Sequence, residues 1–277
     1  MLLLGIAVLS LAAGVLVCLG CDAFLTLAWL WMLPVSILGF ALGLLALGFG
    51  ILMIMCKRVD QNVPQEADDK FYRFVADLII QSALPVLQIH VKTSGLEKVP
   101  TDRRFMLVCN HTNNSDPIIL LYALRKSQLA FISKKENSTM FVIGPMMHKL
   151  QCQLINREND REALKTILKC IQILKEDKAS IAVFPEGGIN DDHKFHHFRP
   201  GVFKIAQKAN VPIVVCTLKN TRDVIHNLLR LKPSHVELDV LEVIPAEELH
   251  GVTTVDIAHR CHGIMAANLP AELIAED

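Results

Sequence analysis

The first 56 residues of this chain contain a single charged side chain, Asp22, and this limits their folding more than any other feature of the sequence. As one helix, the apolar stretch at residues 23–56 would reach about 51 Å, well beyond the roughly 30 Å hydrocarbon core of a bilayer. We therefore expect Pro34 to divide it. Asp22 would cost about 3 kcal/mol at the bilayer centre, so it belongs in the connection between two spans. Gly39 and Gly43 could seat the first helix against the second. The sequence thus predicts a membrane-embedded helical hairpin.

Two alternatives to a spanning hairpin must be weighed. A cleaved signal peptide is disfavoured, because residues 1–21 lack a basic start and a second apolar block follows at once. A shallow re-entrant hairpin fits the sequence nearly as well and stays open. Trp29 and Trp31 suit one membrane interface, and Lys57 and Arg58 suit the other. Because basic residues follow the second stretch and none separates the two, we expect the rest of the chain on the cytoplasmic face of the cell membrane.

Beyond the hairpin, the chain has the charge density of an ordinary soluble domain. We divide the sequence into a membrane anchor (1–58), a linker with an amphipathic helix (59–85) and a larger domain (86–277). The helix is predicted from apolar residues at helical spacing, which are Phe71, Phe74, Val75, Leu78 and Ile79. This face could lie at a membrane interface or against the protein core, and the second interpretation is preferred.

The composition does not indicate a nucleic-acid ligand, a disulfide framework or a metal site. The 28 basic and 28 acidic side chains balance, so nothing indicates a nucleic-acid ligand. The eight cysteines lie in apolar contexts and are expected to be core residues in a reducing compartment. No metal site is predicted either, because the one metal-like cluster matches no zinc spacing; it consists of Asp191, Asp192, His193, His196 and His197.

From residue 86 onward, short β-rich runs alternate with helical patterns. This alternation predicts an α/β fold with a mostly parallel central sheet flanked by helices. The candidate strands are 86–92, 104–109, 129–132, 151–155, 180–184, 212–217 and 236–243. The candidate helices are 117–124, 160–176, 202–210 and 255–267.

The turn between the strand at 104–109 and the helix beginning at Pro117 is the first candidate site. Ser115 or Asp116 is a natural N-cap, and the turn opens at the carboxyl end of a strand, where α/β sheets bind ligands. Asp116 can fold back onto the imidazole of His111, fix its tautomer and leave the other ring nitrogen free to accept a proton from a hydroxyl. The alternative interpretation is a simple helix cap beside a loop histidine.

Two further turns follow candidate strands. Arg157 closes an apolar strand, where its guanidinium could bind a phosphate or carboxylate, although a surface salt bridge is the alternative. At Phe184-Pro185-Glu186-Gly187-Gly188, proline ends the strand and paired glycines let backbone N–H groups approach a ligand. A tight turn with a solvated glutamate is the alternative here.

Four blocks follow one another along this part of the chain: Asn110–Asp116, Gly144–Arg157, Phe184–Gly187 and Val211–Ile213. In this order and spacing, they resemble the motifs of the glycerolipid acyltransferase family, most closely the bacterial 1-acyl-sn-glycerol-3-phosphate acyltransferases. The resemblance implies a membrane-bound enzyme that moves a fatty acyl group from an acyl thioester to the free hydroxyl of a lysophospholipid. Its first candidate acceptor is 1-acyl-sn-glycerol-3-phosphate, and the product is then phosphatidic acid.

The same resemblance implies roles for individual residues. His111 would be the general base and Asp116 its orienting partner, with direct attack and no acyl-enzyme. The residues expected at the glycerophosphate end are Arg157, Glu186 and Gly187, with Lys134 or Lys135 as a second phosphate contact. No cofactor is expected beyond acyl-CoA or acyl-ACP as co-substrate. The expected partners are the lysophospholipid, the thioester donor, membrane lipids and, as one candidate, acyl carrier protein.

One departure from the family pattern bears on the acceptor. Many members carry threonine and arginine after the Glu-Gly pair, whereas this chain has Gly188 and Ile189. Arg199 or Lys204 could supply the missing charge from the next segment. An acyltransferase for another lysophospholipid or for glycerol phosphate therefore stays open, as do a thioester hydrolase and a non-catalytic, membrane-anchored lipid-binding protein of the same fold.

Overall fold

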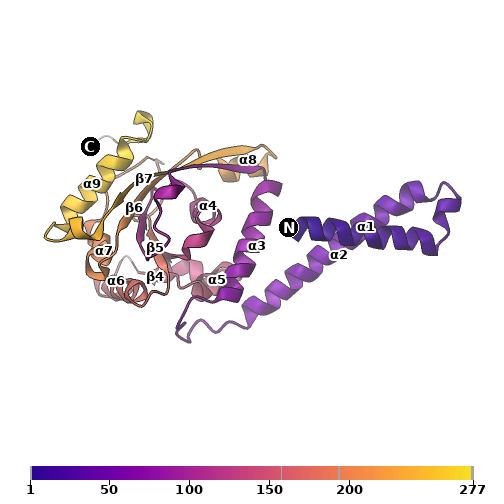
Figure 1. Ribbon diagram of the computed structural model, residues 1–277, viewed down its shortest axis with the longest axis horizontal. Coiled ribbons are helices and arrows are strands. Elements are labelled where there is room, and N and C mark those ends of the chain that lie inside the picture. The colour runs from indigo at the N-terminus through magenta and orange to yellow at the C-terminus, as the bar shows by residue number, and fades with distance from the viewer. Residues whose placement is uncertain (1, 157, 193, 276–277) are drawn as a thin grey trace. The chain divides into compact units, whose positions relative to one another are not determined.

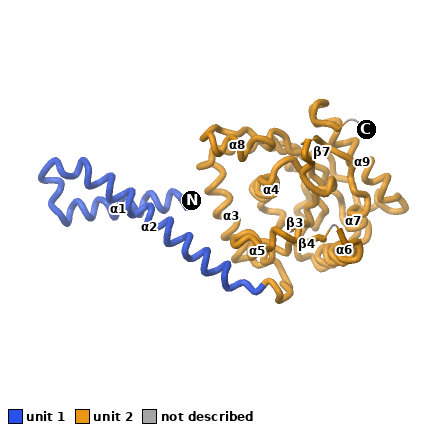
Figure 2. The backbone as a smooth tube through the Cα atoms, turned by 180° about the vertical axis from the view of Figure 1, so that it is seen from behind, with its two compact units in different colours: residues 1–60 blue, residues 61–277 orange. Residues whose placement is uncertain are grey.

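The computed structural model describes residues 2–156, 158–192 and 194–275, and the chain divides into two compact units, 1–60 and 61–277 (Figure 2). The first unit is a helical hairpin of α1 (Leu2–Gly20) and α2 (Trp29–Lys57). Both helices are long and apolar enough to cross a membrane, judged by length and composition. Asp22 lies in the connection with a left-handed backbone, φ 51°, so its predicted position is confirmed.

Two predictions about the hairpin are wrong. Pro34 does not divide the second stretch, because it lies inside the continuous helix α2, and the break falls before Trp29 instead. The small-residue seam lies on α1 and not at Gly39 and Gly43. Its members, Ser10, Gly14 and Cys18, are buried, whereas a Cβ added to Gly39 or Gly43 would meet nothing within 4 Å.

The second unit is built on a seven-stranded sheet in the order β1-β7-β6-β2-β5-β3-β4. All neighbouring strands are parallel except β6 and β7, so the predicted α/β class and mostly parallel sheet are confirmed. The strands are β1 (Ile89–Ser94), β2 (Met106–Val108), β3 (Leu129–Lys134), β4 (Gln153–Ile155), β5 (Ser180–Val183), β6 (Ile213–Lys219) and β7 (Ser234–Ile244).

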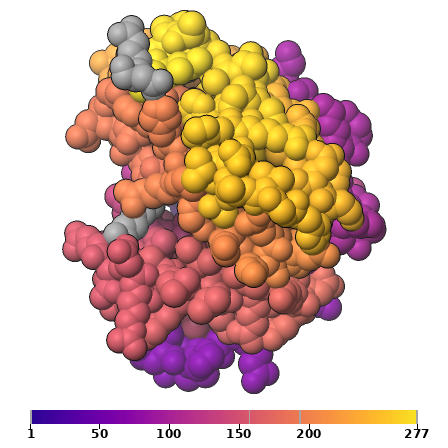
Figure 3. Space-filling model, turned by 90° about the vertical axis from the view of Figure 1, so that its left-hand side faces the viewer, coloured from indigo at the N-terminus to yellow at the C-terminus, as the bar shows by residue number. Residues whose placement is uncertain are grey.

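Helices cover both faces of this sheet (Figure 1). They are α3 (Lys70–Val86), α4 (Asp116–Ala123), α5 (Ile143–Lys149), α6 (Asp160–Lys175), α7 (Lys204–Ala209), α8 (Val224–Leu229) and α9 (Thr254–Ala266). Successive residues of a strand point to opposite faces. Met106 and Val108 accordingly pack with α6, α7 and α9, while Leu107 packs with α3 and α4. Figure 3 shows the outer side of the face that carries α6, α7 and α9, where the yellow C-terminal residues lie beside the orange segment that includes α7.

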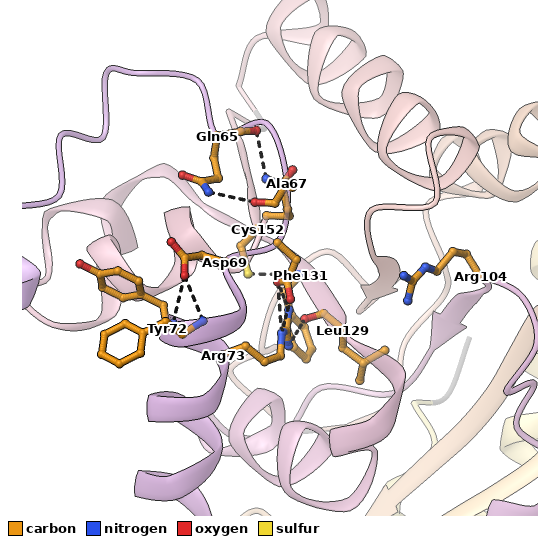
Figure 4. Close-up of polar contacts among 12 residues, drawn as sticks. Gln65, Ala67, Asp69, Tyr72, Arg73, Arg104, Leu129, Phe131 and Cys152 are labelled. Atoms are coloured by element: carbon orange, nitrogen blue, oxygen red, sulfur yellow. Dashed lines mark hydrogen bonds and ion pairs between the residues drawn. The ribbon is translucent and has the colours of Figure 1, made fainter.

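Arg73 attaches α3 to the sheet by donating to the carbonyl of Leu129 at the start of β3, with 3.1 Å between Nη1 and O (Figure 4). The same guanidinium forms a buried ion pair with Asp68, which lies just before the helix, with 2.6 Å between Nη2 and Oδ1. Asp69 caps the helix by accepting the backbone N–H groups of Phe71 and Tyr72. The preferred prediction that the apolar face of this helix meets the core is wrong for Phe71, Phe74 and Ile79, which are exposed, whereas Val75 and Leu78 of the same face are half-buried. Its buried residues are Arg73, Ala76 and Leu84, and its exposed apolar residues are Phe71, Phe74, Ile79 and Val86.

Candidate functional site

His111 and Asp116 meet in the turn that follows β2. His111 Nδ1 lies 2.9 Å from Asp116 Oδ2, and the same oxygen accepts the backbone N–H groups of Thr112 and Asn113 at 2.8 and 2.9 Å. Because an ionised carboxylate only accepts, Nδ1 donates and the lone pair of His111 stays on Nε2. The Asp116 side chain is fully buried, while that of His111 is 15% exposed. The imidazole of His111 thus lies between the buried carboxylate of Asp116 and the protein surface.

Local sequence explains only part of this turn. Ser115 occupies the N-cap position of α4, but its side chain makes no capping bond and donates instead to Asn113 Oδ1. Pro117 is the second residue of α4, since the helix begins at Asp116. The carboxylate of Asp116 points back into the turn and satisfies backbone donors there. A simple helix cap therefore does not account for it.

The imidazole is also held from its face. The ring of Phe184, which follows β5, stacks on His111 with a centroid distance of 4.1 Å and an interplanar angle of 16°. Phe131 of β3 stacks behind Phe184 at 6.1 Å. Since β2, β5 and β3 are adjacent parallel strands, three neighbouring strands contribute to the position of one ring. The apolar stack keeps the histidine in one orientation.

Glu186 is turned inward and is not a solvated loop residue. Its Oε1 accepts the backbone N–H of His111 at 2.9 Å, and its Oε2 accepts that of His196 at 3.1 Å. Burial raises the pKa of Glu186 to about 7, against the opposing effect of these two backbone hydrogen bonds. The carboxylate therefore links the His111 turn to the segment that follows Gly187.

Gly187 and Arg199 are in direct contact. Gly187 has φ +88°, and a Cβ built on it would lie 2.5 Å from Arg199 Nε. The backbone N–H of Arg199 donates to Pro185 O at 2.9 Å, which returns the chain to this turn. Only glycine leaves room for the arginine side chain to cross here. The structure thus brings Arg199 beside the turn that carries Glu186.

The other predicted binding residues are less closely assembled. Lys134 ends β3 and Lys135 begins the following 3₁₀ helix, both with exposed side chains at the carboxyl end of the sheet. Lys204 begins α7. Arg157 lies outside the described residues, so its predicted place at the site stays a prediction.

Several residues that the sequence did not reveal hold the His111 turn. The side-chain amide of Asn110 pairs with both backbone groups of Leu218, each at 2.8 Å, and so continues the contact between β2 and β6. Thr112 and Thr221 share a 2.6 Å hydroxyl contact, and Asn113 donates to the carbonyl of Arg222. The clue in the sequence was a cluster of amide and hydroxyl residues beside an apolar strand.

Known proteins resemble this chain over the region that contains the site. A family model described as Acyltransferase matches residues 90–219. The probable 1-acyl-sn-glycerol-3-phosphate acyltransferase of Mycoplasma pneumoniae is 30% identical over 65% of this chain and 67% of its own length. The 1-acyl-sn-glycerol-3-phosphate acyltransferase of Haemophilus influenzae is 27% identical over 65% of this chain and 75% of its own.

A plant relative and a solved structure also match this chain. A chloroplastic 1-acyl-sn-glycerol-3-phosphate acyltransferase of Arabidopsis thaliana is 33% identical over 55% of this chain, which spans only 42% of that protein. The crystal structure of the 1-acyl-sn-glycerophosphate acyltransferase PlsC from Thermotoga maritima superposes with a TM-score of 0.61. That match covers 81% of this chain and 90% of the other at 20% identity, a level that supports the fold alone.

Proposed function

Because this chain belongs to the acyltransferase family, we propose that it moves a fatty acyl group from an acyl thioester to the free hydroxyl of 1-acyl-sn-glycerol-3-phosphate. The observation that carries the chemistry is the contact between His111 Nδ1 and Asp116 Oδ2, which leaves Nε2 available as a base. The names of the relatives from Mycoplasma pneumoniae and Haemophilus influenzae support the choice of acceptor.

In the proposed reaction, His111 Nε2 takes the hydroxyl proton as the oxygen attacks the thioester carbonyl carbon. Asp116 stabilises the imidazolium that forms, and Phe184 keeps the ring in place. The tetrahedral intermediate then breaks its carbon–sulfur bond, and the departing thiolate takes the proton from the imidazolium. General-base assistance of this kind is typically worth about 10²–10⁴ in rate.

Direct attack is favoured over an acyl-enzyme by the state of the nearby nucleophiles. Cys109 is fully buried, and burial raises the pKa of its thiol well above the ordinary value. A protonated, inaccessible thiol is a poor nucleophile. The hydroxyl of Ser115 is engaged with Asn113. Neither residue offers a second nucleophile beside His111.

Arg199 is our candidate for the charge that binds the acceptor phosphate. Its side chain crosses Gly187 beside the His111 turn, and across residues 2–156, 158–192 and 194–275 no carboxylate pairs with it. A guanidinium suits a phosphate because its N–H groups can bind two oxygens at once. Lys134, Lys135 and Arg157 remain candidates for further phosphate contacts, with Gly187 as the close-approach residue.

The hairpin of α1 and α2 is our candidate membrane anchor, with the larger unit on the cytoplasmic side. Two observations support a membrane location: the apolar length of both helices and the exposed Phe71 and Phe74 on α3. The cytoplasmic side is proposed from Lys57 and Arg58, the basic residues that follow the second apolar stretch. Aromatic residues on an amphipathic helix favour the interface between lipid and water. The donor is acyl-CoA or acyl carrier protein charged with a fatty acid, and the reaction as written needs no further cofactor.

The deciding experiment uses the purified full chain, labelled acyl-CoA and acyl-ACP, and a panel of lysophospholipids with glycerol 3-phosphate. We expect labelled phosphatidic acid from 1-acyl-sn-glycerol-3-phosphate, its loss in His111→Ala and its retention in His259→Ala, a matched exposed histidine on α9. Labelled free fatty acid as the main product would identify a hydrolase. Binding of lysolipid without any turnover would identify a lipid-binding protein.

A further inference from the structure

The turn that ends α8 places a leucine where glycine is normally preferred. Lys232 N donates to Asn227 O at 2.9 Å and Leu231 N to Leu228 O at 3.1 Å, the two bonds of a Schellman motif. Leu231 therefore has φ +53°, a left-handed conformation that costs a leucine backbone free energy relative to glycine. A leucine at this position calls for a role for its side chain.

That side chain has no place in the core. Leu231 is 83% exposed and Leu229 is 80% exposed, the two highest values among the exposed large apolar residues in the described part of unit 61–277. Ile225, one helical turn before Leu229, is exposed as well. Exposed apolar side chains that lie close together in the chain indicate a surface that binds a protein partner or a membrane.

The charges around these leucines favour a membrane with anionic lipids as the partner. Residues 222–232 contain three basic side chains and one acidic, a net charge of +2 with His226 neutral. Arg222, Arg230 and Lys232 are all exposed, and the described residues include no ion pair to any of them. Leucines flanked by cations fit an anionic lipid surface, where the apolar tips enter the acyl region and the cations meet the headgroups.

The helix α8 is linked through Ser234 to the residues that follow α3. Ser234 N donates to Gln88 O at 2.9 Å just beyond the end of α3, and Asn227 of α8 donates to Ser234 Oγ at 3.2 Å. Figure 1 shows α8 and the end of α3 at the same margin of the domain. Val86, the last residue of α3, is exposed as well.

Residues 222–232 are also connected to the candidate site. Thr221 bonds Thr112 at 2.6 Å, and Arg222 O accepts from Asn113 at 2.9 Å, so the segment leading into α8 is held by the His111 turn. We propose that residues 222–232 form a membrane-inserting tip, in which Leu229 and Leu231 enter an anionic bilayer and hold the His111 turn at the lipid surface. The proposal rests on the membrane location proposed above but not on the identity of the acceptor.

Site-directed labelling tests insertion directly. The full chain carrying Cys21→Ser is reconstituted in vesicles of phosphatidylcholine and phosphatidylglycerol, and an environment-sensitive fluorophore is attached to Leu231→Cys. The matched control is Leu168→Cys on α6, also an exposed leucine, and the lipid-contact reference is Leu42→Cys on α2. We expect blue-shifted emission and quenching by nitroxide-labelled lipids at 231 and 42 but not at 168.

The reference variant Leu42→Cys distinguishes a failure of the proposed tip from a failure of the proposed membrane location. Quenching at 42 with water-like emission at both 231 and 168 would overturn the tip while leaving the anchor in place. Absence of quenching at 42 and 231 alike would overturn the membrane location together with the tip.

A second variant separates membrane contact from folding. Leu231→Gly relieves the left-handed backbone, so we expect a melting temperature equal to or above that of the wild type. Turnover of acceptor embedded in anionic vesicles should nevertheless fall several-fold, while turnover of a water-soluble short-chain acceptor stays unchanged. Asn210→Gly, which replaces a left-handed residue after α7, is the control and should leave both rates alone. Equal vesicle rates for Leu231→Gly and wild type would contradict the proposal.

Charge reversal tests the headgroup contact. The pair Arg230→Glu and Lys232→Glu should abolish quenching at position 231 in vesicles that contain phosphatidylglycerol. The same reversal at Arg161 and Lys165 of α6 should have no effect. Unchanged quenching in the first pair would exclude the anionic headgroup as the partner of these cations.

Discussion

Glu186 accepts the backbone N–H of His111 at 2.9 Å, so the buried carboxylate of one turn positions the catalytic candidate of another. Both of its oxygens are engaged by protein N–H groups. The residue expected to contact the glycerophosphate end therefore also joins the turn after β2 to the turn after β5. A change at Glu186 should affect the position of His111 even if no substrate atom touches it.

The raised pKa of Glu186 predicts a specific pH dependence of stability. Burial raises its pKa from 4.5 to about 7, so the folded state binds this proton more tightly than the unfolded state. Its stabilising contribution is complete below pH 4.5 and is lost as the pH rises to about 7. The difference in unfolding free energy between wild type and Glu186→Gln should fall by about 3 kcal/mol over that range. Denaturant unfolding of the full chain in detergent at several pH values measures this, and a constant difference would contradict it.

Asp116→Asn should weaken His111 as a base. The amide oxygen would still accept His111 Nδ1–H and the backbone N–H groups of Thr112 and Asn113, but the negative charge that stabilises the imidazolium would be lost. We expect kcat to fall by about 10²–10⁴ with little change in the acceptor KM. Steady-state kinetics alongside melting curves provide the measurement, with Asp160→Asn in the first turn of α6 as control. A kcat near that of the control would rule out the assigned role of Asp116.

Arg199→Ala should weaken acceptor binding without changing the chemical step. We expect a higher KM for 1-acyl-sn-glycerol-3-phosphate, an unchanged KM for the acyl donor, and partial rescue by Arg199→Lys, because lysine keeps the charge but not the two-pronged geometry. Arg161→Ala is the matched control. An unaltered acceptor KM would remove Arg199 from the phosphate site.

Gly187→Ala should reproduce part of this defect. The added methyl would lie 2.5 Å from Arg199 Nε, at a φ of +88° that alanine adopts only with a strain of about 1–2 kcal/mol. The acceptor KM should rise because the guanidinium is displaced. In the Arg199→Ala background the same substitution should have a smaller effect on KM, and a double-mutant cycle measures the difference. Additive effects would show that the two residues do not act together.

Arg73→Met should destabilise the larger unit by about 3–5 kcal/mol, because Asp68 would be left buried and unpaired. The Asp68 side chain is only 4% exposed. Replacing both partners by Arg73→Met and Asp68→Leu should recover most of the loss. Denaturant midpoints of the single and double variants decide this, and a double variant less stable than Arg73→Met would contradict the explanation.

Features that depend on residues close together in the chain could be predicted from the sequence. Asp22 located the connection of the hairpin, alternating apolar runs located all seven strands, and the close spacing of His111 and Asp116 predicted their contact. The helices α5 and α8, of seven and six residues, were not predicted. The equally short α7 was predicted because the 3₁₀ helix at Pro200–Phe203 precedes it and lengthens its helical pattern. Pro34 misled the prediction because it lies inside α2, whereas the break in the apolar stretch falls before Trp29.

Other features depended on segments far apart in the chain. Periodicity shows that α3 has an apolar face, but the Arg73–Asp68 pair and the carbonyl of Leu129 decide that Phe71 and Phe74 face outward. The stack of Phe184 on His111, the bond from Glu186 and the passage of Arg199 across Gly187 join residues that only the sheet order brings together. The sequence by itself determined the strands, most of the helices and the local His111–Asp116 pair. Tertiary structure decided what surrounds that pair, because each further contact is made by side chains that approach only after the parallel strands have assembled.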